Sequence, residues 1–196
     1  QLWIPADCAG HCCGMPFGSK GYATAYQETL HHTIERMWAW SGAGRLPIVI
    51  DASSCAYTLR TCGSALTSAD QERLQKLTLL DSVEFVHDVL LPKLIIHRLP
   101  DEVVLHPNCA LRRMELADKL ANVARACAAS VSIPLNLECC AFAGDRGLLF
   151  PELTASATAP EVAEVCTRAY DGYYSSNLTC EMGMRLATSK PYCSIL

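Results

Sequence analysis

The sequence contains no long hydrophobic run and no recognisable leader. A helix needs about 20 consecutive apolar residues to cross a bilayer, whereas the apolar stretch 89–96 is interrupted by Pro92 and Lys93. We therefore expect no transmembrane segment. The first residues, QLWIPADC, include no initiator Met, no basic region and none of the apolar core of a signal peptide. They are typical of a chain that begins inside a longer protein.

Charge and nucleotide-binding motifs are also scarce. Charged residues make up 18% of the chain, the formal net charge is -4, and Lys and Arg are scattered rather than clustered. Because phosphate backbones are bound by a concentrated cationic face, we expect no nucleic-acid partner. Neither a phosphate loop nor a dinucleotide fingerprint is present, since the one glycine-containing run of this kind, SGAG at 41–44, follows an expected helix. We therefore predict no catalytic residues.

Cysteine, by contrast, is abundant. The chain has 12 cysteines among 196 residues, and its 51% of hydrophobic residues can form a core without covalent cross-links. Two pairs are adjacent in sequence, Cys12-Cys13 and Cys139-Cys140. Neighbouring cysteines suit a disulfide framework poorly but suit a metal site well. We expect a reduced, cytoplasmic protein with metal-binding or reactive thiols, and a secreted disulfide scaffold is the less favoured alternative.

The cysteines recur with an internal period. The two adjacent pairs lie 127 residues apart, and Cys55 and Cys180, each after a polar turn, lie 125 apart. Each pair follows a short stretch ending in proline (WIP, VSIP) and precedes a glycine-containing loop (GMPFGSKG, AFAGDRG). Such matching features predict a duplicated unit. A counterpart of Cys109 would fall upstream of residue 1, so we expect the first unit to be truncated at its N-terminus.

Helical and strand-like segments alternate within each unit. Apolar residues at helical spacing predict amphipathic helices over 22–40 and 111–129, and short apolar runs predict buried parallel strands at 48–50, 103–105 and 131–133. This alternation predicts an α/β fold of two pseudo-repeated Rossmann-like units, with short parallel strands and flanking helices. The expected organisation is a first repeat over 1–66, a helical connector over 67–100 and a second repeat over 101–196.

The second unit contains a complete set of four thiols. Cys109 follows an expected strand, Cys139 and Cys140 follow the next, and Cys180 lies at an expected helix start. Ligands collect at the carboxyl ends of parallel strands, and four thiolates can hold either a 4Fe–4S iron–sulfur cluster or a tetrahedral zinc ion. The spacing of the cysteines in the sequence does not distinguish the cluster from the zinc ion. The first set, Cys12, Cys13 and Cys55, is one ligand short, so we expect it to bind metal weakly or not at all.

Other residues are candidates for supporting roles. Gly14 and Gly144 lie in the loops after the pairs and would let the backbone approach a cofactor closely. His106, directly before Pro107, could orient the site or donate to a cluster sulfur, and a purely structural role is an equal alternative. Metal-free thiol–disulfide chemistry at the two pairs is a further open interpretation.

These motifs carry a family resemblance over nearly the whole chain. The segments CCGMPFGSKG and ECCAFAGDRG, with HPNC before the second pair and SSC or NLTC after each pair, resemble the cysteine-rich CCG domains. Such domains occur in heterodisulfide reductases, in the iron–sulfur component of glycolate oxidase, and at the C-terminus of FAD-linked D-lactate dehydrogenases. The sequence is most similar to the last group, through WIPADCAGHCCGMPFGSKGY and YDGYYSSNLTCEMG.

The resemblance implies a function and its partners. It implies an iron–sulfur domain that passes electrons from a flavin domain of the same polypeptide, carrying FAD, to a quinone or cytochrome-type acceptor during oxidation of a D-2-hydroxy acid. The location would be cytoplasmic, and peripheral association with the inner face of a membrane is compatible with it. A structural zinc-binding interaction domain is the alternative. The sequence departs from the CCG pattern in having Ala52 and Asn177 in place of the first cysteine of a C-x-x-C pair, and Ala141 in place of a glycine.

Overall fold

The computed structural model describes residues 2–196, which form two compact units. The first comprises the residues up to Ile50 together with Ser54–Leu80, and the second comprises Asp51–Ser53 and Asp81–Leu196. Residues 67–100, expected to form a helical connector, are therefore shared between the two units. The predicted boundaries at 66 and 100 stay a prediction.

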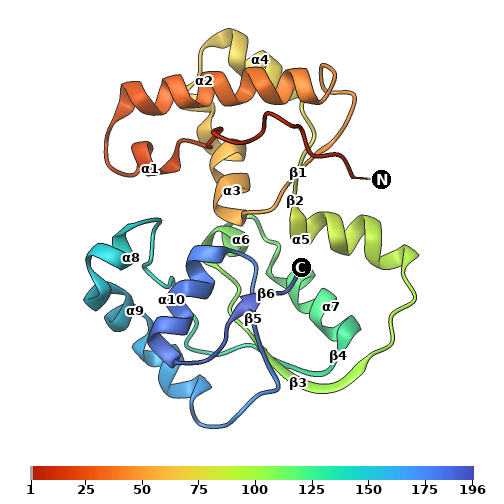
Figure 1. Ribbon diagram of the computed structural model, residues 1–196, viewed down its shortest axis with the longest axis vertical. Coiled ribbons are helices and arrows are strands. Elements are labelled where there is room, and N and C mark those ends of the chain that lie inside the picture. Colours follow the sequence, from red (N-terminus) through yellow and green to blue (C-terminus); the bar gives the residue numbers. More distant parts are fainter. Residues whose placement is uncertain (1) are drawn as a thin grey trace. The chain divides into compact units, whose positions relative to one another are not determined.

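The first unit is mainly helical (Figure 1). The elements in this part of the chain are α1 (Met15–Gly18), α2 (Ala23–Trp40), β1 (Ile48–Ile50), α3 (Ser53–Thr61), the 3-10 turn η1 (Cys62–Ala65), α4 (Ser68–Lys76) and β2 (Leu79–Asp81). The strands β1 and β2 form a two-stranded parallel sheet. Thr67 caps α4 by accepting a hydrogen bond from the backbone N–H of Asp70 at 3.2 Å. The core lies under one face of α2, where Leu30, Ile34 and Met37 are buried.

The second unit is built on a four-stranded parallel sheet against which helices pack (Figure 1). Its elements are α5 (Ser82–Phe85), the π-helical turn η2 (Val86–Leu90), the 3-10 turn η3 (Leu91–Lys93), β3 (Leu99–Leu105), α6 (Cys109–Arg113), α7 (Ala117–Cys127), β4 (Ala128–Ser132), α8 (Arg146–Leu149), α9 (Pro151–Val165), β5 (Gly172–Ser175), α10 (Leu178–Thr188) and β6 (Cys193–Ser194). The strand order is β4-β3-β5-β6 and all neighbours are parallel. Helix α7 packs on β3 and β4, and α10 packs on β5 and β6.

The predicted α/β class with short parallel strands and flanking helices is confirmed. The expected strand at 48–50 is β1, and the run at 103–105 ends β3. The helix predicted over 111–129 differs from the structure, because it is divided into α6 and α7. Glu115 lies between them with a left-handed φ of 60°, which ends one helix before the next begins. Residues 128–132 are strand β4 rather than the end of that helix.

The core of the second unit lies between α7 and the sheet. It contains Leu120, Leu105 and Val83, all with no exposed surface. We expect Leu120→Ala to lower the free energy of unfolding by about 2–5 kcal/mol, because it leaves a cavity among these side chains. Leu135→Ala, at a side chain that is 93% exposed, should change it by less than about 0.5 kcal/mol. Urea unfolding followed by circular dichroism measures both, and equal effects would contradict this assignment of the core.

Within residues 2–196, no helix combines the length and the apolar character that crossing a membrane requires.

Candidate metal centre

Three neighbouring parallel strands bring one histidine and four cysteines to the same edge of the second unit's sheet. His106 and Cys109 follow β3, the Cys139-Cys140 pair lies in the segment after β4, and Cys180 lies in the first turn of α10, after β5. In the sheet, β3 is hydrogen-bonded to β4 on one side and to β5 on the other. Residues separated by up to 74 positions therefore meet because the carboxyl ends of these strands are adjacent.

The four thiols interact as a connected series. The Cys139 and Cys109 sulfur atoms are 3.6 Å apart, Cys139 also interacts with Cys140, and Cys140 interacts with Cys180. Hydrogen bonds from neighbouring thiols lower the pKa of Cys139, and the pKa of Cys180 falls to about 5 for the same reason. Their partner thiols, Cys109 and Cys140, have raised pKa values. The site thus favours two thiolates, the form in which cysteine binds metal.

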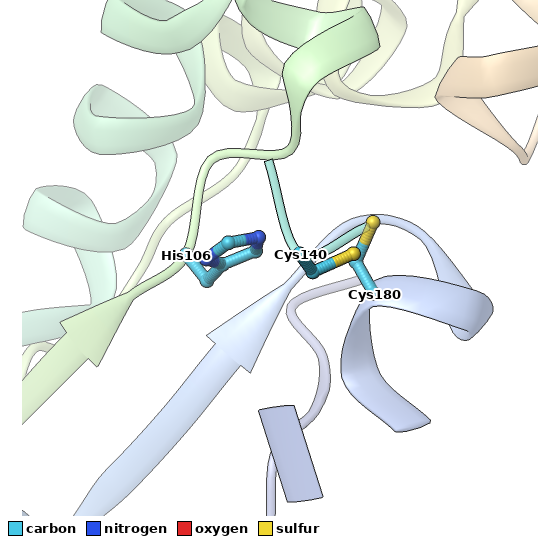
Figure 2. Close-up of side chains that lie close together, drawn as sticks. All are labelled: His106, Cys140 and Cys180. Carbon is cyan, nitrogen blue, oxygen red and sulfur yellow. The ribbon is translucent and has the colours of Figure 1, made fainter. Parts of the chain in front are cut away.

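His106 completes the buried side of this site. Figure 2 shows its ring at the end of β3, facing Cys140, with Cys180 beyond. The ligand atoms of these three buried residues all lie within 4.8 Å of one another. The Nδ1 atom of His106 bonds to the buried carboxylate of Glu161 in α9, at 2.9 Å. Burial alone would lower the pKa of His106, but the Cys180 sulfur and the Glu161 carboxylate outweigh it and raise the pKa to about 9.

Polar residues around the cysteines hold the site in place. Asn108, buried after β3, caps α6 by accepting a hydrogen bond from the N–H of Leu111 at 2.9 Å, and its amide donates to the Ser176 hydroxyl at 2.9 Å. Asn177 donates from its side-chain amide to the Cys180 sulfur at 3.5 Å. Asn177 occupies the position where a C-x-x-C pair would have its first cysteine, so a hydrogen-bond donor to sulfur stands where the family pattern has a ligand.

The loop that carries Cys139 and Cys140 has an unusual backbone. Ala141 and Ala143 have positive φ angles of 53° and 42°, and Gly144 follows with 74°. Ala141 donates its backbone N–H to the Cys139 sulfur at 3.4 Å. In the first unit, Gly14 at φ 76° makes the same bond to the Cys12 sulfur, also at 3.4 Å. The residue after each cysteine pair therefore turns into the left-handed region, which explains why glycine suits this position.

This likeness between the two loops predicts that Ala141→Gly stabilises the second unit. A left-handed alanine costs about 1–2 kcal/mol, whereas the extra freedom of glycine in the unfolded chain costs about 0.5–1 kcal/mol. We expect a net gain of about 0.5–1 kcal/mol in the free energy of unfolding, measured by urea titration. Ala155→Gly, at an exposed position inside α9, is the matched control and should lose about 1 kcal/mol. A loss of stability in both variants would contradict the interpretation of Ala141.

Phe142, in the same loop, packs into the interior of the second unit. Its side chain is buried and packs with Cys140 and Cys180. A Cβ on Gly147 would lie 2.4 Å from the Phe142 ring, and one on Gly183 would lie 3.2 Å from it. Both glycines therefore make room for this ring. Nothing lies within 4 Å of a Cβ built on Gly144, so space does not require glycine at this position. Its positive φ angle is the feature that favours glycine there.

The first cysteine set is smaller and lies within the first unit. Cys13 is buried and its sulfur donates to that of Cys55 at 3.2 Å, which together with burial raises the pKa of Cys13. Cys12 is exposed and its sulfur accepts from Gly14. A Cβ on Gly14 would lie 2.7 Å from the Tyr26 ring, so this glycine brings the loop close to α2. Cys13 and Cys55 correspond to Cys140 and Cys180 in the second unit.

The structure thus brings together the predicted residues of each set, within its own unit. Three contributors to the second site are not among the predicted residues: Glu161, Asn108 and Asn177. Asn108 has a local signal, because an asparagine directly before an expected helix is a typical cap. For Glu161, the available signal is an acidic residue that follows Pro160 in a helix whose neighbouring residues are mostly small or apolar. The assignment of Cys109, Cys139, Cys140 and Cys180, of Cys12, Cys13 and Cys55, and of Gly14, Gly144 and His106 to a bound group remains a prediction.

Comparison with known proteins shows a likeness to a cysteine-rich family in the first unit. Residues 5–60 match the model of the cysteine-rich domain family CCG. This part of the chain, in the first unit, is therefore similar to a CCG domain. It is also 22% identical over 183 residues to lactate utilization protein A 1 of Bacillus mycoides (strain KBAB4), a match that spans 89% of this chain and 72% of that protein. The predicted resemblance to CCG-domain proteins of lactate metabolism is confirmed. The family match includes the first CCG unit's Cys12, Cys13 and Cys55, and the longer similarity extends over most of the second unit.

Proposed function

We propose that this protein binds an iron–sulfur cluster in its second unit and transfers electrons in the oxidation of a D-2-hydroxy acid of the D-lactate type. The observation that carries the proposal is the connected series of four thiols, Cys109, Cys139, Cys140 and Cys180, at one edge of a parallel sheet. The likeness to a lactate utilization protein supports the metabolic context.

The chemistry of the donors fits such a cluster. Thiolates are the usual protein ligands of 4Fe–4S clusters, and a lowered pKa at Cys139 and Cys180 makes thiolates available near neutral pH. Cys180 lies in the first turn of the 11-residue helix α10, where the positive end of the helix dipole stabilises negative charge. Asn177 donates to the same sulfur, and hydrogen bonds to cluster sulfurs are one of the ways in which a protein sets a reduction potential.

The exposure of the ligands gives the site two sides. Cys140 and Cys180 are buried, whereas Cys139 is exposed and Cys109 is half-buried. Electrons would therefore enter and leave on the side of Cys109 and Cys139. A flavin domain carrying FAD in a longer polypeptide is the donor in this proposal, and a quinone or cytochrome-type protein is the acceptor. The location would be cytoplasmic, with peripheral association at the inner face of a membrane.

Reduction by a flavin-linked D-lactate dehydrogenase tests this function. The chain, purified without oxygen, is mixed with catalytic amounts of such an enzyme and D-lactate, and its visible absorbance is followed. We expect the cluster absorbance to bleach with D-lactate and to remain unchanged with L-lactate or without the enzyme. A cluster that dithionite reduces but that the enzyme and D-lactate leave oxidised would contradict the proposed electron donor.

A structural zinc site is the second candidate, and the buried trio of His106, Cys140 and Cys180 favours it. Three thiolates and one imidazole are a common donor set for a tetrahedral zinc ion. Elemental analysis separates the two candidates. One zinc per chain, without iron, inorganic sulfide or a redox response, would favour zinc and exclude electron transfer at this site.

A further inference from the structure

His106 has a bonding arrangement that a purely structural histidine lacks. Its side chain has no exposed surface, and Nδ1 is bound by both carboxylate oxygens of Glu161, at 2.9 and 3.0 Å. Nε2 has no hydrogen-bond partner among the described residues, although it is fully buried. A buried polar atom without a well-formed hydrogen bond costs about 1–3 kcal/mol, and the Cys180 sulfur, which raises the pKa of His106, is the neighbour with which Nε2 could share a metal.

The surroundings of Nε2 show what kind of partner fits. Because Nδ1 is engaged by Glu161, Nε2 is the ring atom that remains for a ligand, and the ligand atoms of His106, Cys140 and Cys180 lie within 4.8 Å of one another (Figure 2). Metal bonds of about 2.0–2.3 Å to nitrogen and sulfur place tetrahedral donors about 3.3–3.8 Å apart. The three atoms are therefore close enough to bind one metal centre.

Glu161 fixes the tautomer that this role requires. A carboxylate accepts hydrogen bonds, so Nδ1 is the ring nitrogen that carries the proton towards Glu161, and in the neutral ring the lone pair lies on Nε2. The backbone of His106 is held by β5, because its N–H donates to the carbonyl oxygen of Tyr174 at 2.8 Å and its carbonyl oxygen accepts from the Ser175 hydroxyl at 2.7 Å. Metal-binding histidines almost always have such a carboxylate or carbonyl on the second nitrogen.

We propose that His106 is a metal ligand through Nε2, so that the metal centre in the second unit has mixed nitrogen and sulfur donors from His106, Cys140 and Cys180. This inference rests on the proposed metal site and deepens it, because it names a nitrogen ligand and a positioning residue, Glu161. A neutral imidazole ligand brings no negative charge to the site, whereas a thiolate at the same position would. We expect a reduction potential higher than that of the His106→Cys variant, as in clusters where histidine replaces cysteine.

Hyperfine spectroscopy on the anaerobically purified chain tests the ligand directly. The chain is prepared with histidine labelled by ¹⁵N, loaded with iron and sulfide, and reduced with dithionite for pulsed electron paramagnetic resonance. We expect a ¹⁵N coupling of a directly bound nitrogen in the wild-type protein. The coupling should disappear in His106→Gln and persist in His87→Gln, a half-buried histidine elsewhere in the second unit. It should also persist in Glu161→Gln, whose side-chain oxygen can still accept from Nδ1.

The outcomes separate this inference from the proposed function. A wild-type protein that holds iron and sulfide but shows no ¹⁵N coupling would overturn the histidine ligand and leave the iron–sulfur function standing. A protein that takes up no iron would end the iron–sulfur function. The ligand is then tested by X-ray absorption on the Co²⁺-loaded chain, where a nitrogen at about 2.0–2.1 Å that His106→Gln removes supports it. Absence of that nitrogen, or of bound Co²⁺, would overturn it.

Discussion

Iron binding is expected to fall by more than about 100-fold in affinity when Cys180 is replaced by serine. Loss of residues that merely support a metal ligand costs about 10–100-fold. Cys180 is the ligand candidate whose thiolate is favoured by Cys140, His106 and Asn177, and it lies at the start of α10. Serine has nearly the same size but a hard oxygen donor that does not deprotonate near neutral pH. The measurement is iron and sulfide per chain after anaerobic reconstitution and gel filtration.

Two controls make this result specific. Cys166→Ser changes an exposed cysteine at the end of α9 and should leave the iron content unchanged. Cys13→Ser, in the first unit, should also leave most of the iron in place, because that unit has three candidate thiols rather than four. Iron content that survives Cys180→Ser but is lost in Cys13→Ser would show that the first unit holds the cluster, contrary to our assignment.

The buried pair of His106 and Glu161 should dominate the stability of the metal-free second unit. We expect Glu161→Leu to lower the free energy of unfolding at pH 7 by about 3–5 kcal/mol, because it leaves the buried imidazole without its partner. His106→Phe should lower the free energy of unfolding by a similar amount, since it leaves the buried Glu161 carboxylate without its partner. Urea unfolding of the chelator-treated protein measures both. Glu152→Leu, at an exposed residue in the same helix, should change the value by less than about 1 kcal/mol.

A double-mutant cycle tests the reason for this loss. Replacing both partners by apolar side chains of similar size removes the unpaired group, so the double variant should be more stable than either single variant. The coupling free energy between the two substitutions should then exceed about 0.5 kcal/mol, the deviation from additivity that independent sites show. Strictly additive losses would mean that each side chain acts through packing alone and that the pair has no electrostatic role.

The positions of the cysteines could be predicted from sequence because they depend on local patterns. Short apolar runs mark β1 and β3, and residues that follow parallel strands meet at one sheet edge, which is how Cys109 and the Cys139-Cys140 pair come together. The internal repeat also anticipates the matching turns at Gly14 and Ala141, where each backbone N–H bonds to the sulfur of the preceding pair. These features need no knowledge of distant contacts.

The parts that could not be predicted depend on tertiary contacts. Glu161 lies 55 residues from His106, and its small and apolar neighbours in α9 do not show which group its carboxylate contacts. The break between α6 and α7 depends on one residue, Glu115, in a conformation that its side chain does not favour. Asn177 looks like the loss of a ligand in sequence, yet in the structure its amide bonds to the Cys180 sulfur. Packing overrides local preference at each of these positions.

Analysis of bound metal in the anaerobically purified chain tests the proposed iron–sulfur site most directly. We predict about four iron and four acid-labile sulfide per chain, with visible absorbance that dithionite bleaches. Both should be lost together in Cys180→Ser and retained in Cys166→Ser. Wild-type protein with the native fold by circular dichroism but with neither iron nor sulfide, before and after reconstitution, would contradict the proposed site.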